Sequence, residues 1–498
     1  MAVRWSALAR ARLLRRSGRT DEAIAIIDAN LAEMPGKADW RRKSALLNER
    51  ALAEIQIGQG AAARDSLIAA SNILVEAGRD STIVYATVID NLGFVEREAG
   101  DLASASEFHE KALVVYEKIG APHHLARSLI NAAIVWKDRG LLGKARAHLE
   151  RAKGIVPASD LRLYGHLYAA SAVLSQLKQE YEEARRQHLI ALIAYRRAGD
   201  RENEALELHN LALVEHLRNK AAVGTRLLRK SMLLNSRLGL APGAASDLRY
   251  LGLFTFDAGK RDEGLRLLRQ AWHALADVGD FEGMLWCELD LARIGTAGGA
   301  HESARDLLDG TIRRAEAIGD PLLEYNLFAA RGRVYEQLGE TGLAAHDYET
   351  AIARAESLRA GIRDEEDALS FFRFAQWEAF DALIELSVEQ GDASTAWRCC
   401  QMAKTRELQR RLRFDSGISP REVSGRSIAR ERSLTASHRK LMAEWRAGHR
   451  AEVLPGIEAI ERELTDLWAE IGMVDPEYAS LRRGEAISYG ALRELLAV

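Results

Sequence analysis

A glycine followed five residues later by an alanine recurs about every 40 residues along most of this 498-residue chain. The clear copies are Gly18/Ala23, Gly58/Ala63, Gly100/Ala105, Gly140/Ala145, Gly299/Ala304 and Gly339/Ala344. Degenerate copies lie between them at Gln179/Ala184, Asn219/Gly224 and Gly259/Gly264, and a late copy, Gly391/Ala396, follows a longer step. A fixed period of this length is typical of a repeat array, in which each unit packs mainly against its neighbours.

Two further positions keep the same register and predict what each unit is. A small residue lies seven residues before the glycine position of each copy but the late one, at Ala11, Ala51, Gly93, Ala133, Ala172, Ala212, Gly252, Ala292 and Gly332. Apolar residues recur at steps of three and four within each half of a unit, which is typical of helices. Each unit is therefore expected to be a helix, a tight turn and a second helix, and the small residues let the two helices cross closely.

The small, glycine and alanine positions, spaced seven and five residues apart, resemble the tetratricopeptide repeat. Residues 91–113, NLGFVEREAGDLASASEFHEKAL, carry the clearest copy. The period also overlaps that of HEAT and armadillo repeats, but the close-packing positions favour the tetratricopeptide pattern with longer helices. The resemblance extends from residue 4 to about residue 413. It implies an all-α, right-handed superhelical solenoid of about nine to ten helix pairs, with the first helix of each pair on the concave face.

The pattern changes after residue 358, where we end the regular solenoid. An insertion sets off a terminal, atypical helix pair over residues 359–413, and the Gly, Ser and Pro residues of 414–427 predict a loop. Apolar steps of three and four then predict a helical hairpin over residues 428–472. Its seam is expected at Leu434, His438, Leu441, Trp445, Ile457, Ile460, Leu464, Leu467 and Ile471. Between Lys404 and Arg450 there are 13 basic and five acidic residues, so this region is basic.

The order of these segments resembles the region that precedes the caspase-like protease domain of CHAT proteins. The resemblance rests on the array, a terminal pair ending in AKTRELQRRL, the basic hairpin and the phrase PEYASLRRGEAISYGALRELL. It implies that residues 473–498 are the start of, or a linker to, a CHAT-like protease domain. In that family the catalytic His and Cys lie well beyond this phrase, so no residue of this chain inherits those roles.

No arrangement of side chains predicts an enzyme, a metal site or a cofactor. His123 and His124 are adjacent and diverge, while His209 and His216 have no further ligand at metal-binding spacing. Cys287 lies in an apolar helical stretch, where a free cysteine is usually a small buried hydrophobe. Phosphate-binding sequences of the GxxxxGK[ST] and GxGxxG types do not occur. We therefore expect a non-enzymatic chain that binds no cofactor.

Composition favours a cytoplasmic protein without a membrane partner. The three cysteines are too few to staple the chain, which indicates a reducing compartment. No run of 18 or more apolar residues occurs, and arginines interrupt the opening segment where a signal peptide needs its apolar region.

Three asparagines hold one equivalent place, two residues before the small residue of their units: Asn91, Asn131 and Asn210. An amide offers a donor and an acceptor together, so such a row can pair with the backbone of an extended peptide. In tetratricopeptide proteins that bind peptides, the resemblance implies this role. The alternative is that each asparagine bonds the neighbouring helix and bridges adjacent repeats.

Five other residues are expected on the concave face from their offsets within their units: Lys137, His209, Arg249, Phe256 and Arg333. Positive charges there suit an acidic peptide or a C-terminal carboxylate. The alternative for each residue is an ordinary solvated helix face.

The leading hypothesis for function is a protein- or peptide-binding scaffold that senses a partner in its concave groove. By the second resemblance, it regulates or positions a CHAT caspase-like protease in cis or in trans, in prokaryotic defence or regulated cell death, and the hairpin offers a route to oligomers. The competing hypothesis is a stand-alone, peptide-responsive signalling sensor or adaptor whose basic hairpin contacts nucleic acid. No recognised nucleic-acid-binding motif supports that role, and docking on an acidic neighbour explains the charge equally well.

Overall fold

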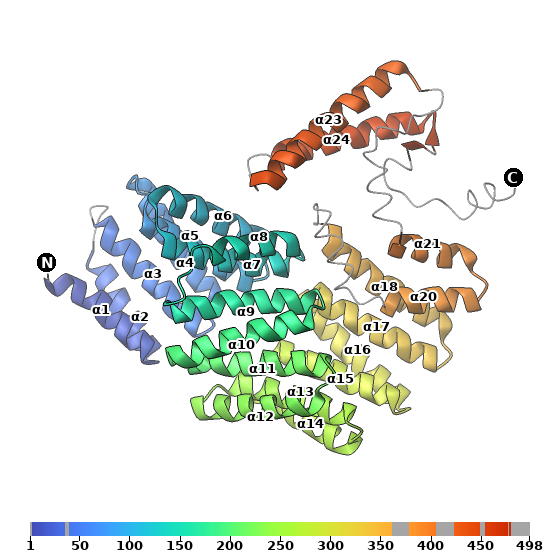
Figure 1. The fold of residues 1–498 in the computed structure, drawn as a ribbon, viewed down its shortest axis with the longest axis horizontal. Coiled ribbons are helices and arrows are strands. Elements are labelled where there is room, and N and C mark those ends of the chain that lie inside the picture. Colours follow the sequence, from blue (N-terminus) through green and yellow to red (C-terminus); the bar gives the residue numbers. More distant parts are fainter. Residues whose placement is uncertain are drawn as a thin grey trace. The chain divides into compact units, whose positions relative to one another are not determined.

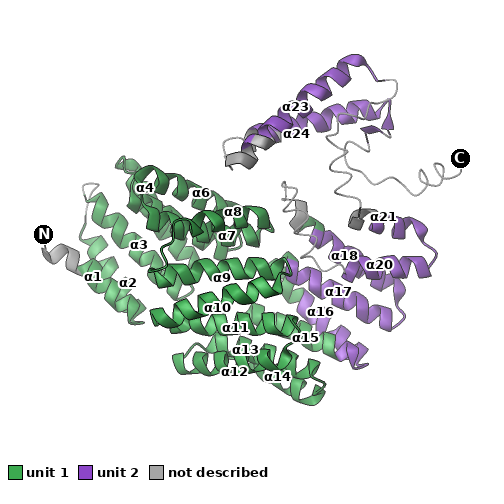
Figure 2. Ribbon diagram, viewed as in Figure 1, with its two compact units in different colours: residues 1–294, 313–321, 356–375 green, residues 295–312, 322–355, 376–498 purple. Residues whose placement is uncertain are grey.

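The computed structural model describes residues 2–34, 39–360, 378–404, 423–448, 454–476 and 478–479. Within these residues the secondary structure is α-helical with short turns and contains no strand. The chain divides into two compact units (Figure 2). Unit 1 comprises residues 1–294, 313–321 and 356–375, and unit 2 comprises residues 295–312, 322–355 and 376–498.

Helices follow one another in pairs along the array, as Figure 1 shows for unit 1. The helices of unit 1 are α1 (Ala2–Arg16), α2 (Thr20–Ala32), α3 (Trp40–Gln56), α4 (Gly60–Glu76), α5 (Ile83–Glu98), α6 (Leu102–Ile119), α7 (Pro122–Asp138), α8 (Leu142–Lys153), α9 (Leu161–Leu177), α10 (Tyr181–Ala198), α11 (Arg201–Leu217), α12 (Ala221–Leu238), α13 (Ala241–Asp257), α14 (Arg261–Asp277) and most of α15 (Phe281–Ala297). The other described helices are α16 (His301–Ile318), α17 (Pro321–Gln337), α18 (Thr341–Ala360), α20 (Glu378–Glu389), α21 (Ala393–Lys404), α23 (Gly425–Gly448) and α24 (Leu454–Gly472). This architecture confirms the predicted all-α helical-repeat fold.

The glycine position of each repeat is the turn inside a helix pair. Gly18, Gly58 and Gly100 have φ values of 79°, 75° and 84°, in the left-handed region that favours glycine. Two of the three degenerate copies lack a glycine and adopt the same backbone conformation, with φ of 61° at Gln179 and 59° at Asn219. The turn geometry is therefore a property of the repeat.

The small positions let the two helices of a pair interlock. A Cβ atom added to Gly252 would lie 2.8 Å from Leu268, and one added to Gly332 would lie 2.7 Å from Tyr348. In each case the contacting side chain comes from the second helix of the same pair. The alanines at this position, Ala11, Ala51, Ala133, Ala172, Ala212 and Ala292, are all buried. The predicted close crossing is confirmed.

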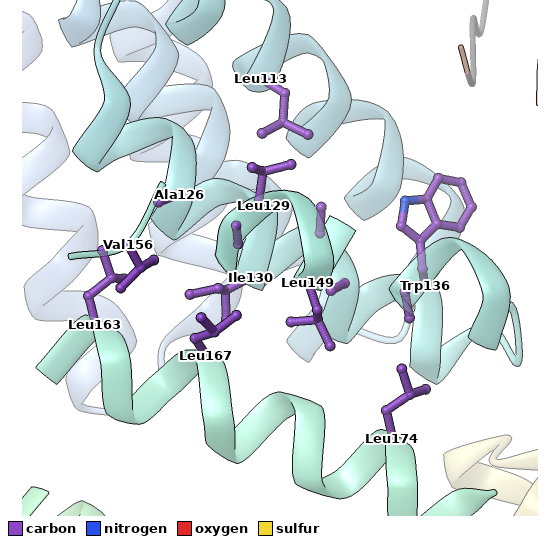
Figure 3. Packing of buried hydrophobic residues seen from close by; sticks show 14 of the residues in the cluster. Leu113, Ala126, Leu129, Ile130, Trp136, Leu149, Val156, Leu163, Leu167 and Leu174 are labelled. Carbon is purple, nitrogen blue, oxygen red and sulfur yellow. The ribbon is translucent and has the colours of Figure 1, made fainter. Parts of the chain in front are cut away.

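Large apolar side chains hold consecutive pairs together. Figure 3 shows this packing around α7, α8 and α9, where Leu129, Leu149 and Leu167 meet at 0–4% exposure. Burying one such side chain stabilises a protein by roughly 1.5–3 kcal/mol. The core of unit 1 thus continues from one pair to the next and keeps the first helices side by side.

Helices α23 and α24 form the predicted hairpin, and its seam contains a polar group that the sequence did not reveal. Ile457, Leu464, Leu467 and Ile471 are buried as expected. The carboxylate of Glu431 is also buried: it accepts hydrogen bonds from Trp468 Nε1 at 2.9 Å and from Tyr478 Oη at 2.6 Å. Trp445 lies outside the residues whose side chains are described.

Several predictions fall wholly or partly outside the described residues. Only α20 and α21 represent the terminal pair over 359–413, and most of the 414–427 loop is not described. Of residues 473–498, which carry the CHAT-like phrase, the structure describes only 473–476, 478 and 479. None of the described helices is long and apolar enough to cross a membrane.

Candidate functional site

A groove of about 350 Å³ lies in unit 1 between the first helices of three consecutive pairs, α7, α9 and α11. We call it the inner groove. Polar and small residues that line it are Arg127, Asn131, Lys137, His166, Ala169, Ala170, Tyr195, Asn203, Glu207 and Asn210. Its walls also include Ile134, Val173 and Leu206. The groove therefore combines apolar side chains with amides and charges.

Local sequence signals fix where the three groove helices begin. Pro122 occupies the first turn of α7, where a missing backbone N–H is tolerated. Asp160 caps α9 by accepting from the backbone N–H of Leu163 at 3.2 Å, and Asp200 caps α11 by accepting from that of Asn203 at 3.3 Å. Capping sets the register in which each helix presents its side chains to the groove.

Small residues on the central helix make the groove hollow. Ala170 holds the place on α9 that Asn131 holds on α7 and Asn210 holds on α11. A Cβ atom added to Gly165 would lie 2.7 Å from the ring of Tyr195, so glycine is what allows that ring to pack against α9. The hollow thus lies between two helices that carry amides.

The three predicted asparagines fall into different environments. Asn131 is half-buried in the groove, and its amide has no hydrogen-bond partner among the described residues. Asn210 also lines the groove, and its only described side-chain bond is a long one of 3.4 Å to Glu207 Oε1. Asn91 does not line the groove: it donates to Asn48 Oδ1 at 2.8 Å and bridges α5 to α3. The bridging alternative therefore describes Asn91, and a peptide-binding role for Asn131 and Asn210 stays a prediction.

The positively charged side chains of Lys137 and Arg127 line the groove, and they differ in how closely a carboxylate neutralises them. Lys137 Nζ lies 2.5 Å from Asp138 Oδ1, a neighbour that offsets its charge. Arg127 is 41% exposed and lies 3.9 Å from Asp90 Oδ2, at the limit of an ion pair. Arg127 is thus the more available positive charge.

His166 is held neutral beside Tyr195. Desolvation by the groove walls lowers the pKa of His166, against the smaller opposite effect of Asp200. Burial raises the pKa of Tyr195, which keeps its hydroxyl protonated. Tyr195 Oη lies 2.9 Å from Nδ1 of His166, and in the tautomer that carries its hydrogen on Nε2 this nitrogen accepts from the hydroxyl. This pair closes one side of the groove without adding a charge.

Three other predicted residues contact neighbouring helices. His209 Nδ1 lies 2.7 Å from the buried Asp247 Oδ1 on α13. Arg249 donates from Nε to Asp290 Oδ2 on α15 at 2.6 Å. Phe256 packs against the apolar cluster of α13, α14 and α15. A role for them in ligand binding stays a prediction.

Arg333 belongs to unit 2 and is not among the residues that line the inner groove. Its Nη1 donates to Glu378 Oε1 at 3.1 Å, and its side chain is 57% exposed. Its role in ligand binding also stays a prediction.

Among the polar groove residues that the sequence did not single out, Asn203 and Arg127 carried a usable signal. Asn203 precedes Asn210 by seven residues, and Arg127 precedes Asn131 by four, so each shares a helix face with a predicted residue. His166 and Tyr195 offered no such signal, because their contact joins two helices.

Two observations on the described residues concern metal binding and thiol chemistry. The described residues contain no group of three or more side chains suited to hold a metal ion. Cys287 is buried, and burial raises the pKa of its thiol to about 12, which disfavours the reactive thiolate.

Comparison with known proteins agrees with this architecture. Residues 84–157, which include α6 and α7, match the family model described as tetratricopeptide repeat. The fold is similar to the apo form of the quorum sensor NprR from B. thuringiensis, with a TM-score of 0.52 at 14% identity, covering 62% of this chain and 87% of that one. It is also similar to a Rap protein complexed with Competence and Sporulation Factor, with a TM-score of 0.54 at 14% identity, covering 72% and 99%.

No curated protein matches the sequence. The structural likenesses establish the class of fold, a tetratricopeptide-like helical-repeat solenoid.

Proposed function

We propose that this chain is a peptide-binding scaffold whose inner groove holds an extended segment of a partner. The observation that carries the proposal is the half-buried amide of Asn131, which lines the groove with no hydrogen-bond partner among the described residues. An extended peptide brings N–H and C=O groups that need partners when they leave water. The amides of Asn131, Asn203 and Asn210 can supply both donors and acceptors.

The groove also favours particular side chains in the ligand. Arg127 and Lys137 suit a peptide that carries a carboxylate. Ile134, Val173 and Leu206 suit apolar side chains, and the groove volume of about 350 Å³ is within the range of ligand sites. Two proteins of similar fold support a receptor role, since NprR is a quorum sensor and the Rap protein is complexed with a factor.

Selection from a displayed library of random peptides tests the proposal. We expect enriched peptides to bind the wild-type chain and to lose roughly fivefold in affinity with Asn131→Ala, since one hydrogen bond contributes about 1 kcal/mol and 1.4 kcal/mol is a factor of ten. Asn210→Ala should act in the same direction. Asn91→Ala is the matched control, because Asn91 bonds Asn48 outside the groove. Equal binding by all three variants would contradict the site.

We further propose that ligand binding regulates or positions a caspase-like protease of the CHAT type. This proposal rests on the sequence resemblance of the terminal pair, the hairpin and the PEYASLRRGEAISYGALRELL phrase. Small rotations between repeats add along an array, so a ligand across several pairs can alter the far end.

Sequencing the reading frame past Val498 tests the protease proposal. We expect a strand-rich domain with a His and a later Cys, and a proteolytic activity that changes when an enriched peptide is added. A reading frame without such a domain, together with no associated protease in the native complex, would refute it.

Charge reversal at Arg410, Arg411 and Arg413 separates this proposal from a nucleic-acid-contacting sensor. These residues lie outside the described part of the chain. If the variant keeps peptide binding and loses a steeply salt-dependent DNA binding, the sensor hypothesis is the better one. If the wild-type chain shows no DNA binding, that hypothesis fails.

A further inference from the structure

A second groove, of about 850 Å³, lies in unit 1 on α1, α3 and the start of α5. We call it the N-terminal groove, and it shares no residue with the inner groove. Three of its apolar side chains are exposed: Leu13 is 68% exposed, Ile83 39% and Val84 36%. Contiguous exposed apolar side chains mark an interaction surface.

The charged residues that line this groove are all positive. They are Arg12, Arg16 and Arg41, and no Asp or Glu is among the lining residues. Glu49 lies nearby and accepts from Arg12 Nε at 3.0 Å, which offsets one of the charges. Arg16 is exposed and has no ion-pair partner among the described residues. A ligand with carboxylates beside its apolar groups therefore complements the groove.

The N-terminal groove offers almost no side-chain acceptor to the backbone N–H groups of an extended peptide, because its arginines and Trp40 can only donate. Its only uncharged hydroxyl or amide side chain among the lining residues is Thr82. That hydroxyl already donates to the Arg79 carbonyl at 2.8 Å and accepts from the Tyr85 N–H at 3.3 Å. Each backbone group buried without a partner costs about 1–3 kcal/mol. A helix satisfies its own backbone groups and avoids this cost.

We propose that the N-terminal groove binds an amphipathic helix of a partner protein, with large apolar side chains facing the groove and Asp or Glu residues along its flanks. Helix-in-groove recognition uses apolar anchors at helical spacing. Leu13, Ile83 and Val84 meet these anchors, and Arg12, Arg16 and Arg41 meet the flanking carboxylates. The ligand is thus of a different kind from the extended segment proposed for the inner groove.

Three synthetic peptides test the proposed chemistry by fluorescence anisotropy with the full chain. The first is a fluorescein-labelled helix of about 18 residues, long enough to hold helical structure, with Leu on one face and Glu on the other. The second replaces each Glu by Lys, and the third places two prolines at its centre to break the helix. We expect the first peptide to bind at least ten times more tightly than the other two. Equal binding of the three, or no binding of the first, would overturn the proposal.

Two exposed substitutions test the location. Leu13→Gln and Arg16→Glu should each weaken binding of the Glu-containing helix at least tenfold. Leu233→Gln and Arg226→Glu are matched controls on α12, where Leu233 is 51% exposed and Arg226 is also exposed. Circular dichroism checks that every variant is folded. Binding that survives both groove substitutions would overturn the assignment.

Asn131→Ala distinguishes this proposal from the proposed function of the inner groove. This variant should bind the Glu-containing helix as the wild-type chain does. A parallel loss with Asn131→Ala and Leu13→Gln would show that the two grooves do not act as separate sites, and would overturn the inference.

Discussion

Gln179 and Asn219 show how strongly the array imposes one backbone geometry on single residues. Both adopt the left-handed conformation that glycine adopts in the other turns inside the helix pairs. This conformation costs most L-residues roughly 1–2 kcal/mol, and asparagine tolerates it better than glutamine. Packing of the flanking helices offsets the cost at both positions.

Gln179→Gly should therefore stabilise the protein by about 1 kcal/mol, less the extra entropy of glycine in the unfolded chain. Asn219→Gly should give a smaller gain. The shift in the urea midpoint of the helical circular dichroism signal measures both effects. A lower midpoint for Gln179→Gly would show that the glutamine side chain contributes more than the strain costs.

His166 makes the inner groove sensitive to acid. Because its pKa is lowered in the folded state, protonation favours the unfolded chain. The stability associated with neutral His166 is complete above the ordinary histidine pKa of about 6.5 and declines as the pH falls below it. Once Nδ1 is protonated, Tyr195 Oη can no longer donate to it.

An NMR titration of the imidazole protons should give a pKa for His166 below about 6.5. The loss of stability on acidification should be smaller in His166→Gln than in the wild-type chain, because that titration is removed. A His166 pKa above the ordinary value would contradict the assigned environment.

At the scale of elements, polar contacts fix how one helix meets the next. Asp90 on α5 accepts from Ser128 Oγ on α7 at 2.7 Å, and His209 on α11 contacts Asp247 on α13 at the same distance. The two contacts use equivalent positions of the repeat. Asp90 and His209 each lie three residues before the small residue of their unit, and Ser128 and Asp247 each lie five residues before the small residue of the next unit. Because hydrogen bonds require a defined geometry, these contacts fix how the first helices of adjacent pairs are oriented, which apolar packing alone does less strictly.

The hairpin depends on a similar contact. Glu431→Leu should destabilise α23 and α24 by about 2–4 kcal/mol, because Trp468 Nε1 and Tyr478 Oη lose their acceptor in a buried site. Hydrogen exchange of the amides in these two helices should rise accordingly. Glu444→Leu is the control, since Glu444 is exposed on the same helix. Equal exchange in the two variants would show that Glu431 is dispensable.

On the scale of the whole molecule, stability is expected to be local along the array. Each pair packs mainly on its neighbours, so a repeat protein behaves nearly as a one-dimensional system. Leu67 on α4 is fully buried in the cluster shared with α3 and α5. It therefore offers a way to weaken one position of unit 1.

Leu67→Ala should cost about 2–5 kcal/mol through lost apolar contact and the cavity it leaves. Hydrogen exchange measured by mass spectrometry should rise most in α3 to α6 and change little in α13 and α14. A uniform rise along unit 1 would instead show that the array unfolds as one cooperative block.

Much of the fold was predictable because its determinants repeat. The turn at Gly18, the crossing at Gly332 and the buried face around Leu464 follow from residues a fixed number of positions apart. The groove was predictable only in part. The offset that selected Asn131 and Asn210, which line it, also selected Asn91, which does not. Asn91 instead donates a hydrogen bond to Asn48, 43 positions earlier in the chain. The spacing of residues within the repeat does not predict which side chain of another repeat will accept that hydrogen bond.

The sequence by itself determined that this chain forms paired helices, where each pair turns and which small residues let its helices cross, because these properties depend on local propensity and on spacing within one unit. Only the tertiary structure decided which polar residues face a groove and which bond a neighbouring helix. The physical reason is that hydrogen bonding and burial depend on side chains from other repeats. Asn131 and Asn91 hold the same place in the repeat, and their neighbours alone make one available to a ligand and the other a bridge.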